Sequence, residues 1–298
     1  MPISLPPLSR RRFLGQSLAA AFAGRTVLGQ SEAGGESWIL FSDSHVAADR
    51  ALVSREANMA GNLEQCVKEA LAWQAKPSGM ILCGDCAFNK GEPGDYETFG
   101  GLIQPLRKAG LPVHLLMGNH DDREQFATVL GQYEKGPSPV EHHHVALVEG
   151  RTANWFLLDS LDKVNSTPGI LGDTQRTWLE KSLDAHSDKP AIVVVHHNVG
   201  LPPAKAGLTD SAELLAILQP RKHVKACIYG HTHTWDVKHD ESGLHLINLP
   251  PTGYVFKKGM PNGWVRAVVS ANAMKLELRC LDTQSAQHAE VKELPWRA

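Results

Sequence analysis

The sequence lacks three features that would each have assigned it to a class of protein. Its five cysteines are an odd number, so they give no complete disulfide framework. No segment reaches the roughly 18 consecutive apolar residues that a membrane-spanning helix needs. The formal net charge is only −2, so the strong positive field of a protein that binds a nucleic acid polymer is not expected. We therefore predict no membrane span and no nucleic acid polymer as a partner.

The cysteines that stand closest together are Cys83 and Cys86, in the spacing C-x-x-C. No second pair accompanies them, so nothing supports a zinc knuckle. Cysteine is among the most buried residue types, and the pattern favours buried free thiols. A single bridge stays open as an alternative if the protein is exported to an oxidising compartment.

The chain has 298 residues, 42% of them hydrophobic, which is ample for a sizeable core. Short apolar runs without in-out alternation are typical of strands covered on both faces. The runs are residues 38–42, 80–83, 113–117, 155–158, 191–195, 226–229 and 244–249. Amphipathic segments at 62–73, 173–185 and 210–218 predict helices, and 264–270 with 275–281 predict an antiparallel hairpin. One α/β domain over residues 36–298 is the economical interpretation.

The N-terminal segment has the order of an export signal. Residues 9–15, SRRRFLG, precede a mild apolar segment at 16–23 that ends in the small-x-small stretch AFA. This order resembles a bacterial twin-arginine signal. We predict a signal peptide and linker over residues 1–30, the twin-arginine export machinery as a partner, and a periplasmic or extracytoplasmic location. A basic disordered tail is the alternative.

Nearly every apolar run ends in residues that bind metal ions. The carboxyl ends of strands line the ligand crevice in open α/β sheets, so these distant residues are expected to converge. Burying so many ionisable groups without a cation would cost several kcal/mol apiece, roughly, so the pattern predicts a metal site. Glycines precede three of the clusters and let the backbone approach closely. The clusters contain Asp43, His45, Asp85, Asn119, His120, Asp121, His196, His197, His231 and His233.

The order D-x-H, G-D, G-N-H-D, H and G-H-x-H resembles the calcineurin-like metallophosphoesterase superfamily over about residues 36–250. The stretches GNHDDR at 118–123 and LDS at 158–160 further resemble its bacterial class III cyclic-nucleotide phosphodiesterase and glycerophosphodiester phosphodiesterase branch. The resemblance implies an α/β fold with a four-layer α/β/β/α sandwich of two mixed β-sheets flanked by helices.

The resemblance also implies a role for each motif residue. Two metal ions would share Asp85, and a hydroxide that bridges them would attack the phosphorus. His120 would protonate the leaving group, and Asp121 would orient an imidazole from outside the metal shell. His197 would line the pocket or face solvent. The first ion would be held by Asp43, His45, Asp85 and His233, and the second by Asp85, Asn119, His196 and His231.

The implied function is hydrolysis of a small phosphodiester or a phosphomonoester, and the branch favours the diester. Nitrogen and oxygen ligands suit two divalent or mixed-valence ions of iron, manganese, zinc or cobalt without choosing among them. One rival is a non-catalytic metal-binding protein on the same fold. Another is a mononuclear iron oxygenase, which has no need for Asn119 or for both His231 and His233. The C-terminal hairpin leaves a homo-oligomer open.

Three further features each have two interpretations. The run His142-His143-His144 is favoured as a solvated loop over a contact with substrate or metal, because it follows Gly136-Pro137-Ser138-Pro139. Arg123 would meet a phosphate oxygen or form a surface salt bridge. The segment 250–254 would shape the substrate pocket or serve as a rigid loop.

Overall fold

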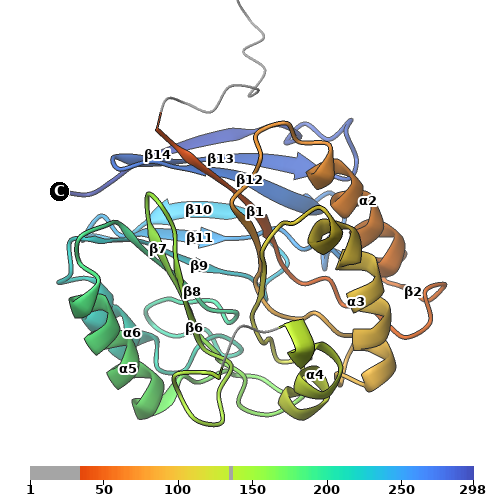
Figure 1. Cartoon of the computed structure of the whole chain (residues 1–298), viewed down its shortest axis with the longest axis horizontal. Coiled ribbons are helices and arrows are strands. Elements are labelled where there is room, and N and C mark those ends of the chain that lie inside the picture. Colours follow the sequence, from red (N-terminus) through yellow and green to blue (C-terminus); the bar gives the residue numbers. More distant parts are fainter. Residues whose placement is uncertain (1–33, 134–136) are drawn as a thin grey trace, which may run out of the picture.

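The computed structural model describes residues 34–133 and 137–298. Two six-stranded mixed sheets pack face to face, and helices cover the outer face of each (Figure 1). The predicted four-layer α/β/β/α sandwich is therefore confirmed. The predicted signal over residues 1–30 lies outside the described residues.

The first sheet has the strand order β14-β13-β12-β1-β4-β5. Strands β1, β4 and β5 run parallel to one another, so their carboxyl ends lie at one edge of the sheet. The predicted hairpin forms the antiparallel pair β12 and β13. The bounds are β1 (Glu36–Phe41), β4 (Gly79–Leu82), β5 (Val113–Leu115), β12 (Gly263–Val269), β13 (Ala273–Cys280) and β14 (Val291–Pro295).

The second sheet has the order β10-β11-β9-β8-β7-β6. Strands β7, β8, β9 and β11 are parallel, while β6 and β10 close the two edges in the opposite direction. A separate small hairpin is formed by β2 (Val53–Ser54) and β3 (Ala57–Asn58). The bounds of the larger sheet are β6 (Ala146–Glu149), β7 (Asn154–Leu157), β8 (Ala191–Val194), β9 (Val224–Tyr229), β10 (Asp236–His239) and β11 (His245–Asn248).

The strands have apolar side chains on both faces, because each sheet is buried on both sides. Between the sheets, the rings of Trp38 and Trp155 pack with centroids 5.0 Å apart. On the outer faces, the helices bury their apolar sides against the strands. The first sheet is covered by α2 (Met59–Leu71), α3 (Pro93–Lys108) and α4 (Arg123–Leu130), and the second by α5 (Gly172–Ala185) and α6 (Ser211–Leu218).

The three amphipathic segments are confirmed as α2, α5 and α6, but α3 and α4 were not among the predicted helices. In α3 the pair Gly100-Gly101 and Pro105 lower the intrinsic helix propensity. Burial of Phe99 and Ile103 against the first sheet offsets that cost. Asp122 caps the short α4, because its side chain accepts a hydrogen bond from the backbone N–H of Gln125.

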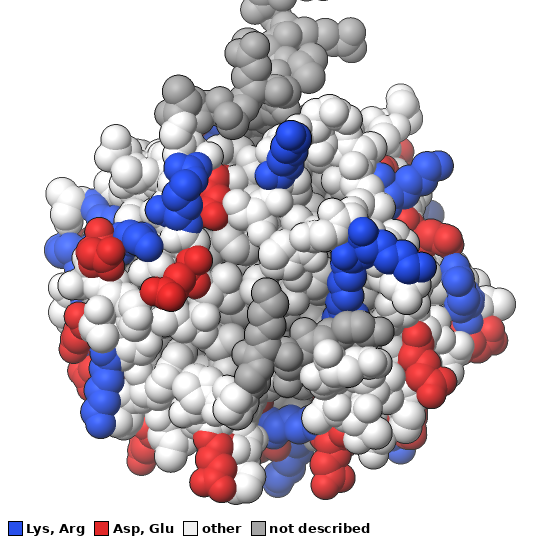
Figure 2. Space-filling view, in the orientation of Figure 1, with Lys and Arg blue, Asp and Glu red and all other residues white. Residues whose placement is uncertain are grey.

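The surface drawn in Figure 2 carries charges of both signs, in keeping with the small net charge of the sequence. On the face drawn in Figure 2, lysine and arginine side chains are interspersed with aspartate and glutamate instead of gathering by sign. Within residues 34–133 and 137–298, none of the helices combines the length and the hydropathy of a membrane span.

Candidate metal centre

The ligand candidates follow the carboxyl ends of five strands that belong to the two sheets. The first sheet supplies its residues from the ends of β1, β4 and β5, and the second from the ends of β8 and β9. All are buried except His231, which is partly exposed. Residues separated by as many as 190 positions are thus neighbours, as the strand-end argument predicted. They are Asp43, His45, Asp85, Asn119, His196, His231 and His233.

Three groups of side chains could each hold a metal ion, and neighbouring groups share a residue. Within each group, the ligand atoms lie within 4.8 Å of one another. His45 and Asp85 each belong to two of the groups. A carboxylate has two oxygens and is suited to connect two neighbouring cation sites. The groups are Asp43 with His45 and His233, His45 with Asp85 and His120, and Asp85 with His196 and His231.

Backbone carbonyls orient two of the histidines. The Nδ1 atom of His196 lies 2.8 Å from the carbonyl oxygen of Cys83, and that of His233 lies 2.6 Å from the carbonyl oxygen of Tyr254. Because a carbonyl only accepts, Nδ1 carries a proton in each ring, which leaves Nε2 as the atom that would bind a metal ion. This is the usual arrangement around a metal-binding histidine.

Two candidate ligands each have a buried polar atom without a hydrogen-bond partner among the described residues, and so does the neighbouring His197 at its Nε2. The two ligand atoms are Oδ1 of Asn119 and Nε2 of His196, and the latter lies 3.3 Å from Oδ2 of Asp85. An unpaired buried polar atom is costly, so native structures rarely keep one without a function or a bound ion. Both atoms are the donor types that transition metals bind, so the residues fit a metal site.

The backbone of the cluster is held in conformations that side chains rarely adopt. Non-glycine residues with positive φ cost about 1–3 kcal/mol each when the position is strained, and they concentrate at functional sites. At Gly118, a Cβ atom would lie 2.1 Å from Oδ1 of Asp85, so only glycine permits this approach. The strained ligand candidates are Asp43 (φ 50°), His45 (47°), Asp85 (53°), His231 (69°) and His233 (53°).

The electrostatics of the cluster favour positive charge. Burial by itself raises the pKa of Asp85, but the nearby His196 and His45 outweigh it and hold this pKa well below its usual range. Burial lowers the pKa of His196, yet the neighbouring Asp85 raises it to about 10. Burial raises the pKa of Asp43. Carboxylates buried so deeply need a compensating cation.

His120 lies at the border of the cluster, as predicted for a proton donor. Its ring is half-buried, with its centroid 5.2 Å from that of His45. The Nδ1 atom lies 2.7 Å from the carbonyl oxygen of Asn89, and the backbone N–H of His120 donates to Oδ1 of Asp85 at 2.8 Å. The ring is fixed at one nitrogen, which leaves the other to meet a substrate. Its catalytic role stays a prediction.

Asp121 has partners other than the imidazole that we expected. Its carboxylate accepts from the backbone N–H groups of Gly118 (2.9 Å), Cys86 (3.2 Å) and Ala87 (3.1 Å), and from the phenol of Tyr96 (3.2 Å). Burial and the nearby Asp85 raise its pKa to about 6. Asp121 therefore ties the loop after β4 to the loop after β5, and acts on the metal cluster by positioning those loops.

The neighbouring histidines after β8 have different surroundings. His196 belongs to a metal-binding group, while His197 does not. The Nδ1 atom of His197 lies 2.8 Å from Oγ of Ser160, and its ring centroid lies 4.7 Å from that of His231. His197 is completely buried, so it borders the cluster and the alternative that it faces solvent is wrong.

Arg123 forms a salt bridge, and its partner is a buried carboxylate instead of one on the surface. Its guanidinium binds the carboxylate of Asp159 through two hydrogen bonds of 2.6 and 2.9 Å, and Asp159 is completely buried. A third hydrogen bond reaches the carbonyl oxygen of Leu161. This bidentate pair ties α4 to the loop after β7, so Arg123 does form the salt bridge that we considered, with a buried carboxylate as its partner.

The histidine run at 142–144 takes no part in the metal-binding groups among the described residues. His142 is exposed, as expected of a solvated loop. His144 is partly buried instead, with Nε2 2.9 Å from the carbonyl oxygen of Leu115 and its ring against Phe126. All five cysteines are buried and free, so Cys83 and Cys86 do not pair.

An aromatic wall, formed by Tyr254 and Phe256, borders the metal cluster. The ring of Tyr254 stacks on His45 with centroids 4.8 Å apart, and that of Phe256 stacks on His233 at 4.0 Å. Over both rings lies the guanidinium of Arg55. The segment 250–254 therefore does shape the site. Sequence reasoning missed Arg55 and Phe256, because neither belongs to a motif.

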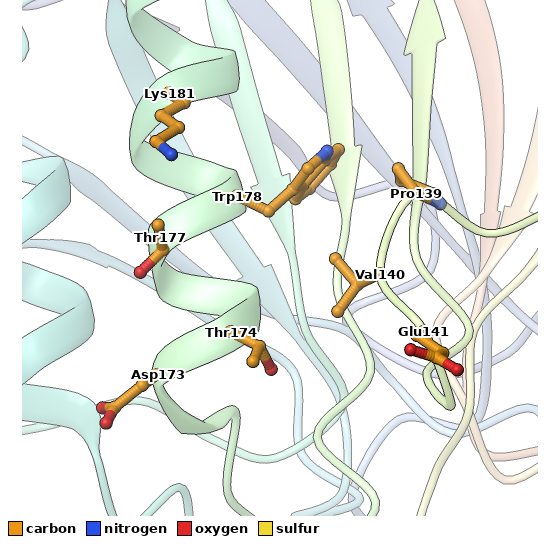
Figure 3. A pocket seen from close by; sticks show the side chains of 8 residues that line it. All are labelled: Pro139, Val140, Glu141, Asp173, Thr174, Thr177, Trp178 and Lys181. Atoms are coloured by element: carbon orange, nitrogen blue, oxygen red, sulfur yellow. The ribbon is translucent and has the colours of Figure 1, made fainter.

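A separate groove of about 480 Å³ lies between α5 and the loop before β6. Figure 3 shows Trp178 extending from the helix toward Val140 and Pro139. None of the metal-binding residues lines it, so the groove and the metal cluster are distinct features.

The sequence profile of calcineurin-like phosphoesterases matches residues 39–235, the span that carries all the ligand candidates. The chain belongs to the calcineurin-like phosphoesterase family. The metal cluster is therefore the centre of a metallophosphoesterase, a metal-dependent hydrolase, and the family resemblance predicted from the motifs is confirmed.

Similar proteins agree with this assignment. A 3′,5′-cyclic adenosine monophosphate phosphodiesterase of Haemophilus influenzae is 29% identical over 222 residues, covering 72% of this chain and 76% of the relative. A probable glycerophosphodiester phosphodiesterase of Arcobacter nitrofigilis is 28% identical, covering 64% and 70%. A dimetal phosphatase from Danio rerio shares the fold, with a TM-score of 0.68 at 13% identity over 89% of this chain and 100% of that one.

Proposed function

We propose that the protein hydrolyses a small phosphodiester with two metal ions. The observation that supports two ions is the membership of Asp85 in two metal-binding groups. The diester preference is supported by relatives named as cyclic-nucleotide and glycerophosphodiester phosphodiesterases. Asp43, His45, Asp85 and His233 would hold the first ion, and Asp85, Asn119, His196 and His231 the second.

The chemistry of the ligands suits an anionic substrate. Two divalent ions would supply a nucleophilic water and stabilise the negative charge of the phosphoryl oxygens. Asp43 and Asp85 are the only carboxylates in the two proposed shells, and Asn119 would bind through a neutral carbonyl oxygen. The positive excess left over would attract a phosphoester monoanion. Nitrogen and oxygen ligands suit iron, manganese, zinc or cobalt.

The remaining residues would hold and move protons. His120, fixed at Nδ1 by the carbonyl of Asn89, would give a proton from its other nitrogen to the departing alkoxide. Asp121 would keep the strand ends in register through the backbone N–H groups of Gly118, Cys86 and Ala87. His197, its Nδ1 bound to Ser160, would border the second ion.

The test is an assay of bis(p-nitrophenyl) phosphate against p-nitrophenyl phosphate after chelation and reloading with each candidate metal. We expect the diester to be the better substrate and activity to return with about two ions per chain. Binding of two ions without hydrolysis of either substrate would favour a non-catalytic metal-binding protein. A faster reaction with the monoester would make the protein a phosphomonoesterase.

We also infer that the protein is exported by the twin-arginine route, on the basis of residues 9–15 and the apolar segment that follows. Replacing Arg10 and Arg11 together by lysine should retain the protein in the cytoplasm of a bacterial host, as measured by fractionation. Unchanged export of that variant would contradict the proposal. A homo-oligomer stays a prediction.

A further inference from the structure

The small hairpin of β2 and β3 presents an arginine beside the metal cluster. Its tip is Arg55-Glu56, and both residues adopt left-handed backbone conformations, with φ of 51° and 65°. Two-residue hairpin turns of this kind normally contain Asn-Gly, which adopts such conformations more easily. Strained backbone of this sort is retained where it serves a function.

The side chain of Arg55 lies over the aromatic wall. The guanidinium carbon is 5.0 Å from the ring centroid of Phe256 and 5.5 Å from that of Tyr254, within the range of a cation–π contact. Phe256 also stacks on His233, so its ring connects the guanidinium of Arg55 with a proposed metal ligand.

The charge of Arg55 has no carboxylate partner in residues 34–133 and 137–298. The ion pairs among the described residues include none with Arg55, whereas the nearby Arg50 pairs with Glu64 at 2.9 Å. Phe256, which remains 53% exposed, is followed in the chain by the exposed Lys257 and Lys258. Neither lysine takes part in an ion pair of the described residues. Within the described part of the chain, the border of the site next to His233 thus has three cationic side chains that take part in no ion pair.

We propose that Arg55, held over Phe256 and Tyr254, binds a second anionic group of the substrate, a carboxylate or a phosphate on an alcohol of the scissile diester. This inference rests on the proposed phosphodiesterase function and narrows its substrate class. A planar guanidinium presents several donors to an oxyanion, and its stacking on two rings limits the freedom it would lose on binding. The two lysines strengthen the field around it.

The test compares phosphodiesters with one p-nitrophenyl leaving group and different second alcohols. The neutral ester is the propyl ester, the two anionic esters are carboxypropyl and phosphonopropyl, and the cationic ester is aminopropyl. Each is assayed with the metal-loaded full-length protein. We expect the anionic esters to have the higher kcat/KM and the cationic ester the lowest. The two anionic esters distinguish a carboxylate from a phosphate as the preferred group.

Variants assign the preference to Arg55. Arg55→Gln keeps much of the stem that packs on the rings and removes the charge, so it should reduce the anionic-to-neutral ratio of kcat/KM about fivefold, mainly through KM. Arg55→Lys should have an intermediate ratio, because it keeps the charge but loses the fork of donors. Arg50→Gln is the matched control and should leave the ratio unchanged, since that arginine already pairs with Glu64.

A binding measurement makes the test independent of turnover. Calorimetric titration of the metal-loaded protein should show phosphonobutyrate binding more tightly than butylphosphonate, and the difference should disappear in Arg55→Gln. Equal ratios in the native protein and Arg55→Gln would overturn the subsite. Failure of every diester to react, whatever its second alcohol, would instead contradict the proposed function, and the calorimetric comparison would still decide the subsite.

Discussion

The Nε2 atoms of His45 and His233 lie 3.0 Å apart in the buried cluster. Nδ1 of His233 donates to the carbonyl oxygen of Tyr254, so its Nε2 carries a lone pair that faces the other ring. Burial lowers the pKa of both histidines, which disfavours a second proton on either. Asp43, His45 and His233 form one of the three metal-binding groups, and Oδ1 of Asp43 is 3.5 Å from Nε2 of His233, so these three residues would hold a cation.

Metal removal should therefore destabilise the folded protein as well as inactivate it. Ions that bind only the folded state add about 4 kcal/mol to the free energy of unfolding at a thousand times their dissociation constant. We expect Tm to fall by several degrees after chelation and to recover on reloading, as measured by differential scanning calorimetry. An unchanged Tm would mean that the cluster is stable without ions.

Asp85→Ala should remove both metal ions, because Asp85 is the one ligand that the two proposed ion sites share. The measurement is metal content by mass spectrometry after loading and gel filtration. Asp173→Ala is the matched control, since that carboxylate is exposed on α5 and should leave metal content unchanged. Retention of one ion by Asp85→Ala would show that one of the two sites does not depend on Asp85.

His120→Ala should keep both ions and lose rate, because His120 is the proton donor of the proposed reaction and belongs to neither proposed ion shell. Metal content is measured together with rate, since His120 also forms a group with His45 and Asp85. General acid catalysis contributes about 100-fold to 10,000-fold, and mostly for leaving groups that depart poorly. The loss should therefore be large for an alkyl diester and small for a p-nitrophenyl diester. Equal losses for the two substrates would assign His120 a role other than proton donation.

His196→Ala and His197→Ala should have different effects on metal binding. His196 presents a free Nε2 atom 3.3 Å from Asp85, so its loss should remove one ion per chain. His197→Ala should keep both ions, because its Nδ1 bonds to Ser160 and it lies outside the metal-binding groups. Metal analysis of the two variants shows which histidine is the ligand. Loss of an ion from His197→Ala but not from His196→Ala would make His197 the ligand.

Arg123→Ala should destabilise the protein without weakening substrate binding. The substitution leaves Asp159 buried and unpaired, which costs about 2 kcal/mol for a partly exposed partner such as this arginine. Urea unfolding of the metal-free protein measures that change, and Arg50→Ala supplies a matched exposed pair with an expected loss near zero, about 0.5 kcal/mol at most. A rise in KM at unchanged stability would instead indicate that Arg123 contacts the phosphate of the substrate.

The sequence by itself indicated the layered fold, through the family resemblance of its motifs, and a set of candidate metal ligands that the structure places near one another. Each motif is local, since polar ligands such as Asp43 and His45 directly follow an apolar run, and parallel strands bring such ends to one edge. The requirement for glycine at 118 was visible for the same reason, because a close approach needs a residue without Cβ. Helix α3 escaped prediction because Gly100, Gly101 and Pro105 weaken a pattern that tertiary packing then overrides.

Only the tertiary structure decided which neighbours meet. His196 and His197 are adjacent in sequence, and the Cys83 carbonyl of the opposite sheet orients the first while Ser160 holds the second. Arg55 and Phe256 are 201 positions apart, and a hairpin tip with left-handed backbone brings them together. Contacts of this kind depend on how the sheets and loops pack, and a local pattern of residues contains no record of that packing.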